Sequence, residues 1–133
     1  MALIAPHGAT ELRPLIVDDV RRGELEAEAL TLASLMMSSA AAAIAVMMGA
    51  GYFTPLSGYM NRADALSVAE NMRTTYGLFW PVPVVNLAES CPVEVGQRLA
   101  LTDPNREGQP MLAVMTVEAI ETLSDEDVAT ILD

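Results

Sequence analysis

Hydrophobic residues in the middle of the chain follow a helical period and then meet residues that end helices. Four large apolar residues recur at offsets i, i+3, i+4 and i+8, which predicts a helix with one apolar face. They are Ile44, Met47, Met48 and Tyr52. Gly49 and Gly51 each cost about 1 kcal/mol in a helix interior, and Pro55 costs roughly 3 kcal/mol. The helix should therefore end near Gly51, and residues 54–58 should form a turn.

Polar residues that can cap a helix start precede four stretches of the chain. A side-chain oxygen at such a position accepts one of the free backbone N–H groups of the first turn. The candidates are Asp18-Asp19, Ser38 or Ser39, Asn61 with Asp64, and Ser124, which is followed by Asp125, Glu126 and Asp127. We therefore predict four helices, and acidic residues in a first turn favour the positive end of the helix dipole.

The first and third of these helices should also bury one face. In the first helix the apolar positions are Leu25, Ala29 and Leu32, while Glu24, Glu26 and Glu28 lie largely on the solvent side. The third helix runs to about Met72, and its buried positions are Ala65, Val68 and Met72.

Extended segments are predicted from alternating or continuous apolar runs. Residues 11–17 should form an edge segment around Pro14, and residues 35–37 a short extended piece. The clearest strand is expected at residues 78–87. Its two prolines, Pro81 and Pro83, remove backbone donors along one edge, which should face solvent or irregular structure.

A hairpin is predicted near the C-terminal end of the sheet region. Residues 98–102 and 111–117 flank a loop at 103–110. Because residues 111–117 are apolar on both faces, we place that strand at the centre of the sheet. With 133 residues, the chain is expected to form one α+β domain, 1–133, with several short helices and a small curved mixed sheet or barrel of about five strands.

The charge balance limits the class of partner. Eighteen acidic residues oppose seven basic ones, all of them Arg, and the net charge is −11. Nucleic-acid binding requires clustered cations, and only Arg21 and Arg22 are adjacent, so no nucleic acid is expected. A single cysteine, Cys91, cannot form an internal disulfide, and the first 14 residues lack the pattern of a secretory signal. Both observations favour the cytoplasm.

A membrane role is weighed because residues 29–61 contain no charged side chain. The continuous apolar run, residues 40–53, is shorter than a membrane span and consists mostly of alanine. Its length is closer to that of a buried helix. We therefore expect no membrane partner.

Three features could carry chemistry, and each has a more common structural explanation. His7, the only histidine, lies between Pro6 and Gly8 with no evident nucleophile beside it. Cys91 has no basic neighbour in the sequence that would activate its thiol. The glycines of the segment 49–51 follow a helix, whereas phosphate-binding loops precede one, so they are expected to break the helix and let backbones approach.

Side chains of two other kinds gather without forming a site. The acidic groups around Glu24 and Asp125 lack the spacing of a calcium loop, so solvated helix faces are expected. The aromatic residues are expected to pack in the core or against another domain, because no cationic groove accompanies them. They are Tyr52, Phe53, Tyr59, Phe79 and Trp80. No catalytic, cofactor-binding or metal-binding residue is predicted in this chain.

Four landmarks, in order, resemble the N-terminal domain of the ATP sulfurylases. Gly49–Asp64 resembles the family's G-A-[FY]-[ST]-P-L-x-G-[FY]-M signature, and Pro6-His7-Gly8 resembles its opening segment. Residues 77–84 resemble its G-x-x-[WF]-P-[IV]-P-[IV] strand, and the segments 101–104 and 112–118 resemble its late hairpin. The amino-acid sequence of this hairpin is most similar to that of the prokaryotic enzymes of sulfur oxidisers and sulfate reducers.

The resemblance implies a PUA-like fold and a non-catalytic role. In that family the catalytic domain holds MgATP and sulfate through Q-x-R-N-P, H-x-x-H-type and G-R-D motifs, none of which occurs here. The chain would then be an N-terminal domain truncated before the catalytic domain, and the catalytic domain is its expected partner. By itself the chain is expected to be inactive and to bind no cofactor. A stand-alone PUA-like module for RNA or a protein and a membrane-associated interaction protein are the alternatives. Another copy of the same chain, in a homo-oligomer, is a further alternative for the partner.

Overall fold

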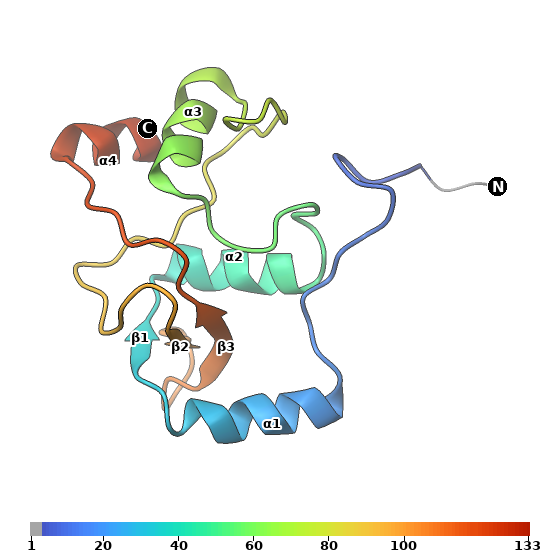
Figure 1. The fold of residues 1–133 in the computed structure, drawn as a ribbon, viewed down its shortest axis with the longest axis vertical. Coiled ribbons are helices and arrows are strands. Elements are labelled where there is room, and N and C mark those ends of the chain that lie inside the picture. Colours follow the sequence, from blue (N-terminus) through green and yellow to red (C-terminus); the bar gives the residue numbers. More distant parts are fainter. Residues whose placement is uncertain (1–3) are drawn as a thin grey trace. The chain divides into compact units, whose positions relative to one another are not determined.

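The computed structural model describes residues 4–133, which divide into two compact units (Figure 1). Unit 1 contains the residues up to 57 together with residues 86–120. Unit 2 contains residues 58–85 and 121–133. The helices and the sheet predicted from the sequence are distributed between these units, and each unit is described by itself.

Unit 1 is built on a three-stranded mixed sheet with the order β1-β2-β3. The strands are β1 (Ser34–Met36), β2 (Arg98–Thr102) and β3 (Met111–Thr116). β1 runs parallel to β2, with Ser34 opposite Ala100, and β2 pairs antiparallel with β3 through the predicted hairpin. A bulge between Leu101 and Thr102 shifts the register at the loop end. The α+β class is therefore confirmed.

Two helices of unit 1 contact the sheet. They are α1 (Asp19–Ala29) and α2 (Ser39–Gly49), and both touch β3. Figure 1 shows α2 along one side of the sheet and α1 along the other. The core lies between them, because Leu99 and Leu101 of β2 are fully buried and Met48 of α2 is almost so. The burial of these apolar side chains is the main source of stability in unit 1.

Unit 2 is a pair of helices with an irregular segment packed on them. The helices are α3 (Arg62–Asn71) and α4 (Asp125–Leu132), which contact each other. Val68 of α3 and Ile131 of α4 are buried, as are Trp80 and Val84 of the irregular segment. The Met60 N–H donates to the Val84 carbonyl at 2.7 Å.

The predicted helix starts are confirmed. In each case a side-chain oxygen accepts the backbone N–H three residues ahead, at 2.8–3.1 Å. The capping residues are Asp18, Ser38, Asn61 and Ser124. The central helix ends at Gly49, within two residues of the expected position, and Leu25, Ala29 and Leu32 are the half-buried side of the first helical segment.

The strand expected at residues 78–87 is wrong. In the described residues this segment forms only an isolated bridge, between Arg73 and Phe79. Two missing N–H groups at Pro81 and Pro83 leave too few donors for a ladder in so short a segment. The described part of the chain accordingly has three strands, so the expected five are not confirmed, and the sheet is open.

Two further strand predictions differ from the structure. The central strand is β2, because β1 pairs with it, so the placement of residues 111–117 at the centre is wrong. Apolar residues on both faces of β3 reflect its contacts with α1 and α2 instead. Residues 11–17 join no strand. The N–H groups of Leu15 and Ile16 both donate to the Gly49 carbonyl, at 2.9 and 3.1 Å.

Three apolar residues expected to be buried are exposed. Met72 is 52% exposed because it caps the end of α3 in the left-handed conformation, with φ 54°. Met47 and Tyr52 are also on the surface, while Ala41, Ala42 and Met48 form the buried side of α2. Among residues 4–133, no helix is both long enough and apolar enough to span a membrane.

Candidate functional site

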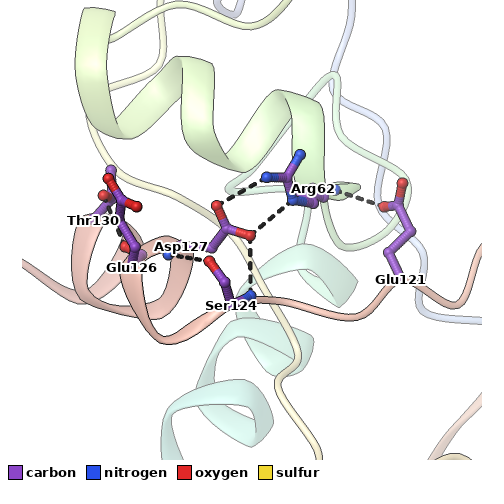
Figure 2. A network of polar contacts seen from close by, with 6 residues as sticks. All are labelled: Arg62, Glu121, Ser124, Glu126, Asp127 and Thr130. Carbon is purple, nitrogen blue, oxygen red and sulfur yellow. Dashed lines mark hydrogen bonds and ion pairs between the residues drawn. The ribbon is translucent and has the colours of Figure 1, made fainter.

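The strongest polar network of unit 2 joins the start of α3 to the start of α4. The Arg62 guanidinium donates to both carboxylate oxygens of Asp127, from Nε to Oδ2 and from Nη2 to Oδ1, each at 2.9 Å (Figure 2). Such a bidentate pair fixes orientation as well as distance. Asp127 is 65 residues away in sequence, so this contact holds together two helices that no local signal connects.

Two further contacts complete the network. Asp127 forms a capping box with Ser124, in which each residue accepts the backbone N–H of the other at 3.1 Å. The backbone N–H of Arg62 donates to the Glu121 carboxylate at 2.7 Å. The first turns of α3 and α4 are therefore tied by charge-assisted hydrogen bonds at three carboxylate oxygens, as Figure 2 shows.

The same contacts keep Asp127 ionised. The hydrogen bonds from Arg62, followed by that from the Ser124 backbone, hold the pKa of Asp127 below its usual range. The pKa of Arg62 is raised in turn by its hydrogen bond and its charge interaction with Asp127. A carboxylate with a lowered pKa does not supply a proton at neutral pH, so this network is suited to positioning α4 and not to acid catalysis.

The glycine-rich segment of unit 1 forms a close backbone crossing. A Cβ on Gly49 would lie 3.1 Å from Cγ1 of Ile16, and one on Gly51 would lie 3.3 Å from the backbone N of Pro14. Gly51 also has φ +86°, which side-chain-bearing residues rarely adopt. The expected structural use of these glycines is confirmed: the helix ends, and the N-terminal segment passes directly over it.

Thr54 holds this crossing closed. Thr54 is only 5% exposed. Its hydroxyl donates a hydrogen bond to the Gly51 carbonyl at 2.7 Å and accepts one from the Arg13 N–H at 3.0 Å. The Gly49 carbonyl accepts two N–H groups from the same N-terminal segment. The end of α2 therefore offers acceptors that are already used, whereas an anion site needs free donors.

The structure places His7 and Cys91, the two residues considered for nucleophilic or acid–base chemistry, in different environments. His7 is exposed in a turn, and Cys91 is half-buried and forms no disulfide. Within residues 4–133, no cluster of three or more His, Cys, Asp or Glu side chains could hold a metal ion.

Three acidic residues of α1 form ion pairs with arginines. Glu24 pairs with Arg21 and Glu26 with Arg22, both at 3.0 Å on the exposed face. Glu28 differs from the expectation of a solvated position, because it is half-buried and binds Arg98 of β2 at 2.8 Å. The apolar side of α1 turns toward the sheet and brings Glu28 within reach of Arg98.

The aromatic residues divide into buried and exposed groups. Trp80 is 7% exposed and belongs to the core of unit 2. Tyr59 is half-buried, and this burial raises the pKa of its phenol to about 12. Tyr52 and Phe79, in contrast, are 75% and 46% exposed. Both side chains therefore lie at the surface of their own units.

Arg62 and Glu121 were not predicted from the sequence to belong to a polar network. Asp127 was identified only as an acidic residue at a helix start, and Arg62 only as part of a motif. The one available signal was that each of the paired residues follows a predicted cap, Asn61 or Ser124.

The comparisons with known proteins agree on the fold. A family model for the PUA-like domain matches residues 4–131. A solved structure described as a hexameric APS kinase from Thiobacillus denitrificans superimposes with a TM-score of 0.70 at 34% sequence identity, covering 86% of this chain and 23% of that chain. The match spans both units of the chain.

The relatives of this chain are considerably longer than it is. The sulfate adenylyltransferase of Alcanivorax borkumensis is 54% identical over 135 residues, which cover 100% of this chain and 34% of that protein. That of Allochromatium vinosum is 52% identical, covering 96% and 32%. The chain thus spans about a third of the length of the relatives it matches. By its motifs, its fold and the match over residues 4–131, this chain belongs to the PUA-like domain family.

Proposed function

We propose that this chain is the non-catalytic N-terminal PUA-like domain of a sulfate adenylyltransferase. The observation that carries the proposal is the 54% identity over the whole chain but only 34% of the A. borkumensis enzyme. The parent reaction is the formation of adenosine 5′-phosphosulfate and pyrophosphate from MgATP and sulfate, or its reverse. The catalytic part of the enzyme is the partner, and the cytoplasm is the compartment.

The ion pairs formed by the arginines support the proposal that this chain is a scaffold and does not bind MgATP itself. Stabilising a polyphosphate requires cationic groups that are free to face it. Four of the seven arginines are held in ion pairs with carboxylates of this chain. They are Arg21, Arg22, Arg62 and Arg98. A nucleotide would have to compete with these pairs on a chain whose net charge is −11.

The pairing of these arginines with carboxylates also argues against the alternative that the chain is an RNA-binding module. Binding to a phosphate backbone gains its free energy from several unpaired cations that displace counterions. With four arginines already paired, few are left to form a cationic groove. The exposed side chains of Tyr52 and Phe79 are better suited to contact a protein surface.

A chimeric enzyme tests the proposal. This chain replaces the matching 135-residue segment of the A. borkumensis sulfate adenylyltransferase, and turnover is measured by phosphate release with MgATP, sulfate and pyrophosphatase. We expect activity close to that of the parent enzyme, because the replaced part supplies no reacting group. A soluble, folded chimera without turnover contradicts the proposal.

A further inference from the structure

The exposed side of α2 has no polar residue after Ser39, the first residue of the helix. After Ser39 the helix consists only of Ala, Ile, Val, Met and Gly, and no charged residue occurs between Ala29 and Asn61. A surface helix normally carries charged or polar side chains toward solvent, and a helix that is apolar all round is normally buried. The exposed positions of α2 after Ser39 are Ala40, Ala43, Val46 and Met47, which recur at helical spacing.

The N-terminal segment extends this apolar surface. Ile16 is 73% exposed and lies over Gly49, which is one helical turn from Val46. Tyr52 is 75% exposed just beyond the helix end, where its N–H donates to the Met47 carbonyl at 3.0 Å. We call the surface formed by Ile16, Val46, Met47 and Tyr52 the α2 face.

The α2 face is fixed in place before any partner binds. The backbone of Leu15 and Ile16 is hydrogen-bonded to Gly49, and Thr54 ties the adjoining turn to Arg13. A partner therefore loses little conformational entropy in ordering this surface. Contiguous exposed apolar patches with a rigid backbone mark protein contact sites.

We infer that the α2 face docks an apolar surface of the polypeptide that follows this domain in the longer enzyme, an inference that rests on the proposed function. About two thirds of each matched relative lies outside the matched region. A covalently connected segment has an effective concentration on the order of millimolar, which a separate copy does not reach. Two copies, each carrying a net charge of −11, would also repel one another.

Photo-crosslinking in the chimera identifies what covers this surface. A benzophenone maleimide is attached at Val46→Cys in a Cys91→Ser background, and crosslinked peptides are identified by mass spectrometry. The matched control is Ala27→Cys, an exposed position on α1. We expect position 46 to crosslink to peptides from the downstream part of the enzyme and position 27 to crosslink to them much less.

The outcomes distinguish this inference from the proposed function. Crosslinks from position 46 to a second copy of residues 1–133, or no crosslink in an active chimera, overturn the inference and leave the proposed function intact. Crosslinks to the downstream part in a chimera without turnover support the docking surface but contradict the proposed function. A Val46→Glu variant provides a second measurement, because a buried unpaired carboxylate should lower the thermal midpoint of the active chimera.

Discussion

The guanidinium of Arg62 binds the carboxylate of Asp127 through two hydrogen bonds of 2.9 Å and so joins α3 to α4. Asp127 of α4 is mostly buried, whereas the paired carboxylates of α1 are more exposed. Removing one partner of such a pair leaves the other without compensation. This pair is therefore expected to determine whether the last helix of unit 2 stays in place.

Replacing Arg62 should destabilise unit 2 selectively. Arg62→Ala removes both bonds to Asp127, and we expect the midpoint of denaturant unfolding to fall clearly. Trp80 is the only tryptophan and is buried in unit 2, so its fluorescence reports this unit directly. Arg22→Ala is the matched control, because it breaks an ion pair on the exposed face of α1. Equal Trp80 transitions in the two variants would show that the pair contributes nothing.

The contribution of Asp127 should disappear in acid. Its pKa is lowered in the folded state by Arg62 and Ser124, so folding is favoured where the carboxylate is ionised. The stabilisation is present above the unfolded-state pKa, about 3.9, and is lost as the pH falls through the lower folded-state value. The stability difference between the wild type and Asp127→Asn should be constant near neutrality and shrink below about pH 4. A difference independent of pH contradicts this assignment.

The predictions that succeeded depend on residues close together in sequence. Ser38, Asn61 and Ser124 were recognised as caps because the accepting oxygen and the donating N–H are three residues apart. The end of α2 was predicted for the same reason, since the glycines act locally. The hairpin of β2 and β3 likewise joins adjacent segments.

The predictions that failed depend on contacts across the chain. β2 is central only because β1, more than 60 residues earlier, pairs with it, and its five residues carry no mark of this. The segment after Leu78 has the composition of a strand, but its prolines prevent a ladder with any neighbour. The pairing of Arg62 with Asp127 was likewise invisible, because each residue is ordinary in its local context.

A side chain at position 51 should loosen the crossing in unit 1. Gly51→Ala places a Cβ 3.3 Å from the Pro14 backbone and forces a non-glycine residue to φ +86°, so a loss of about 1–3 kcal/mol is expected. Gly23→Ala is the control, because that glycine lies in α1 with open space around it and the change should stabilise by about 0.5–1 kcal/mol. Unfolding monitored by circular dichroism should give opposite signs for the two variants. Stability changes of the same sign in the two variants would contradict the close backbone crossing at Gly51.

Thr54 should be required for its hydroxyl and not for its shape. Thr54→Val keeps the volume but leaves the Gly51 carbonyl and the Arg13 N–H without this partner, at a cost of about 1–3 kcal/mol. Thr54→Ser retains the hydroxyl and should recover most of the loss. Amide hydrogen exchange at Arg13 is the local readout, and we expect faster exchange in the valine variant alone. Unchanged hydrogen exchange at the Arg13 amide in Thr54→Val would show that the Thr54 hydroxyl does not hold the crossing closed.

We propose that this chain provides structure and a contact surface, while the reacting groups lie elsewhere in the enzyme. The most direct measurement is phosphate release by the purified 133-residue chain with MgATP, sulfate and pyrophosphatase, beside the intact A. borkumensis enzyme. We predict no release above the protein-free background for the chain and normal turnover for the intact enzyme. Turnover by the chain alone, sensitive to omission of sulfate, would contradict the account.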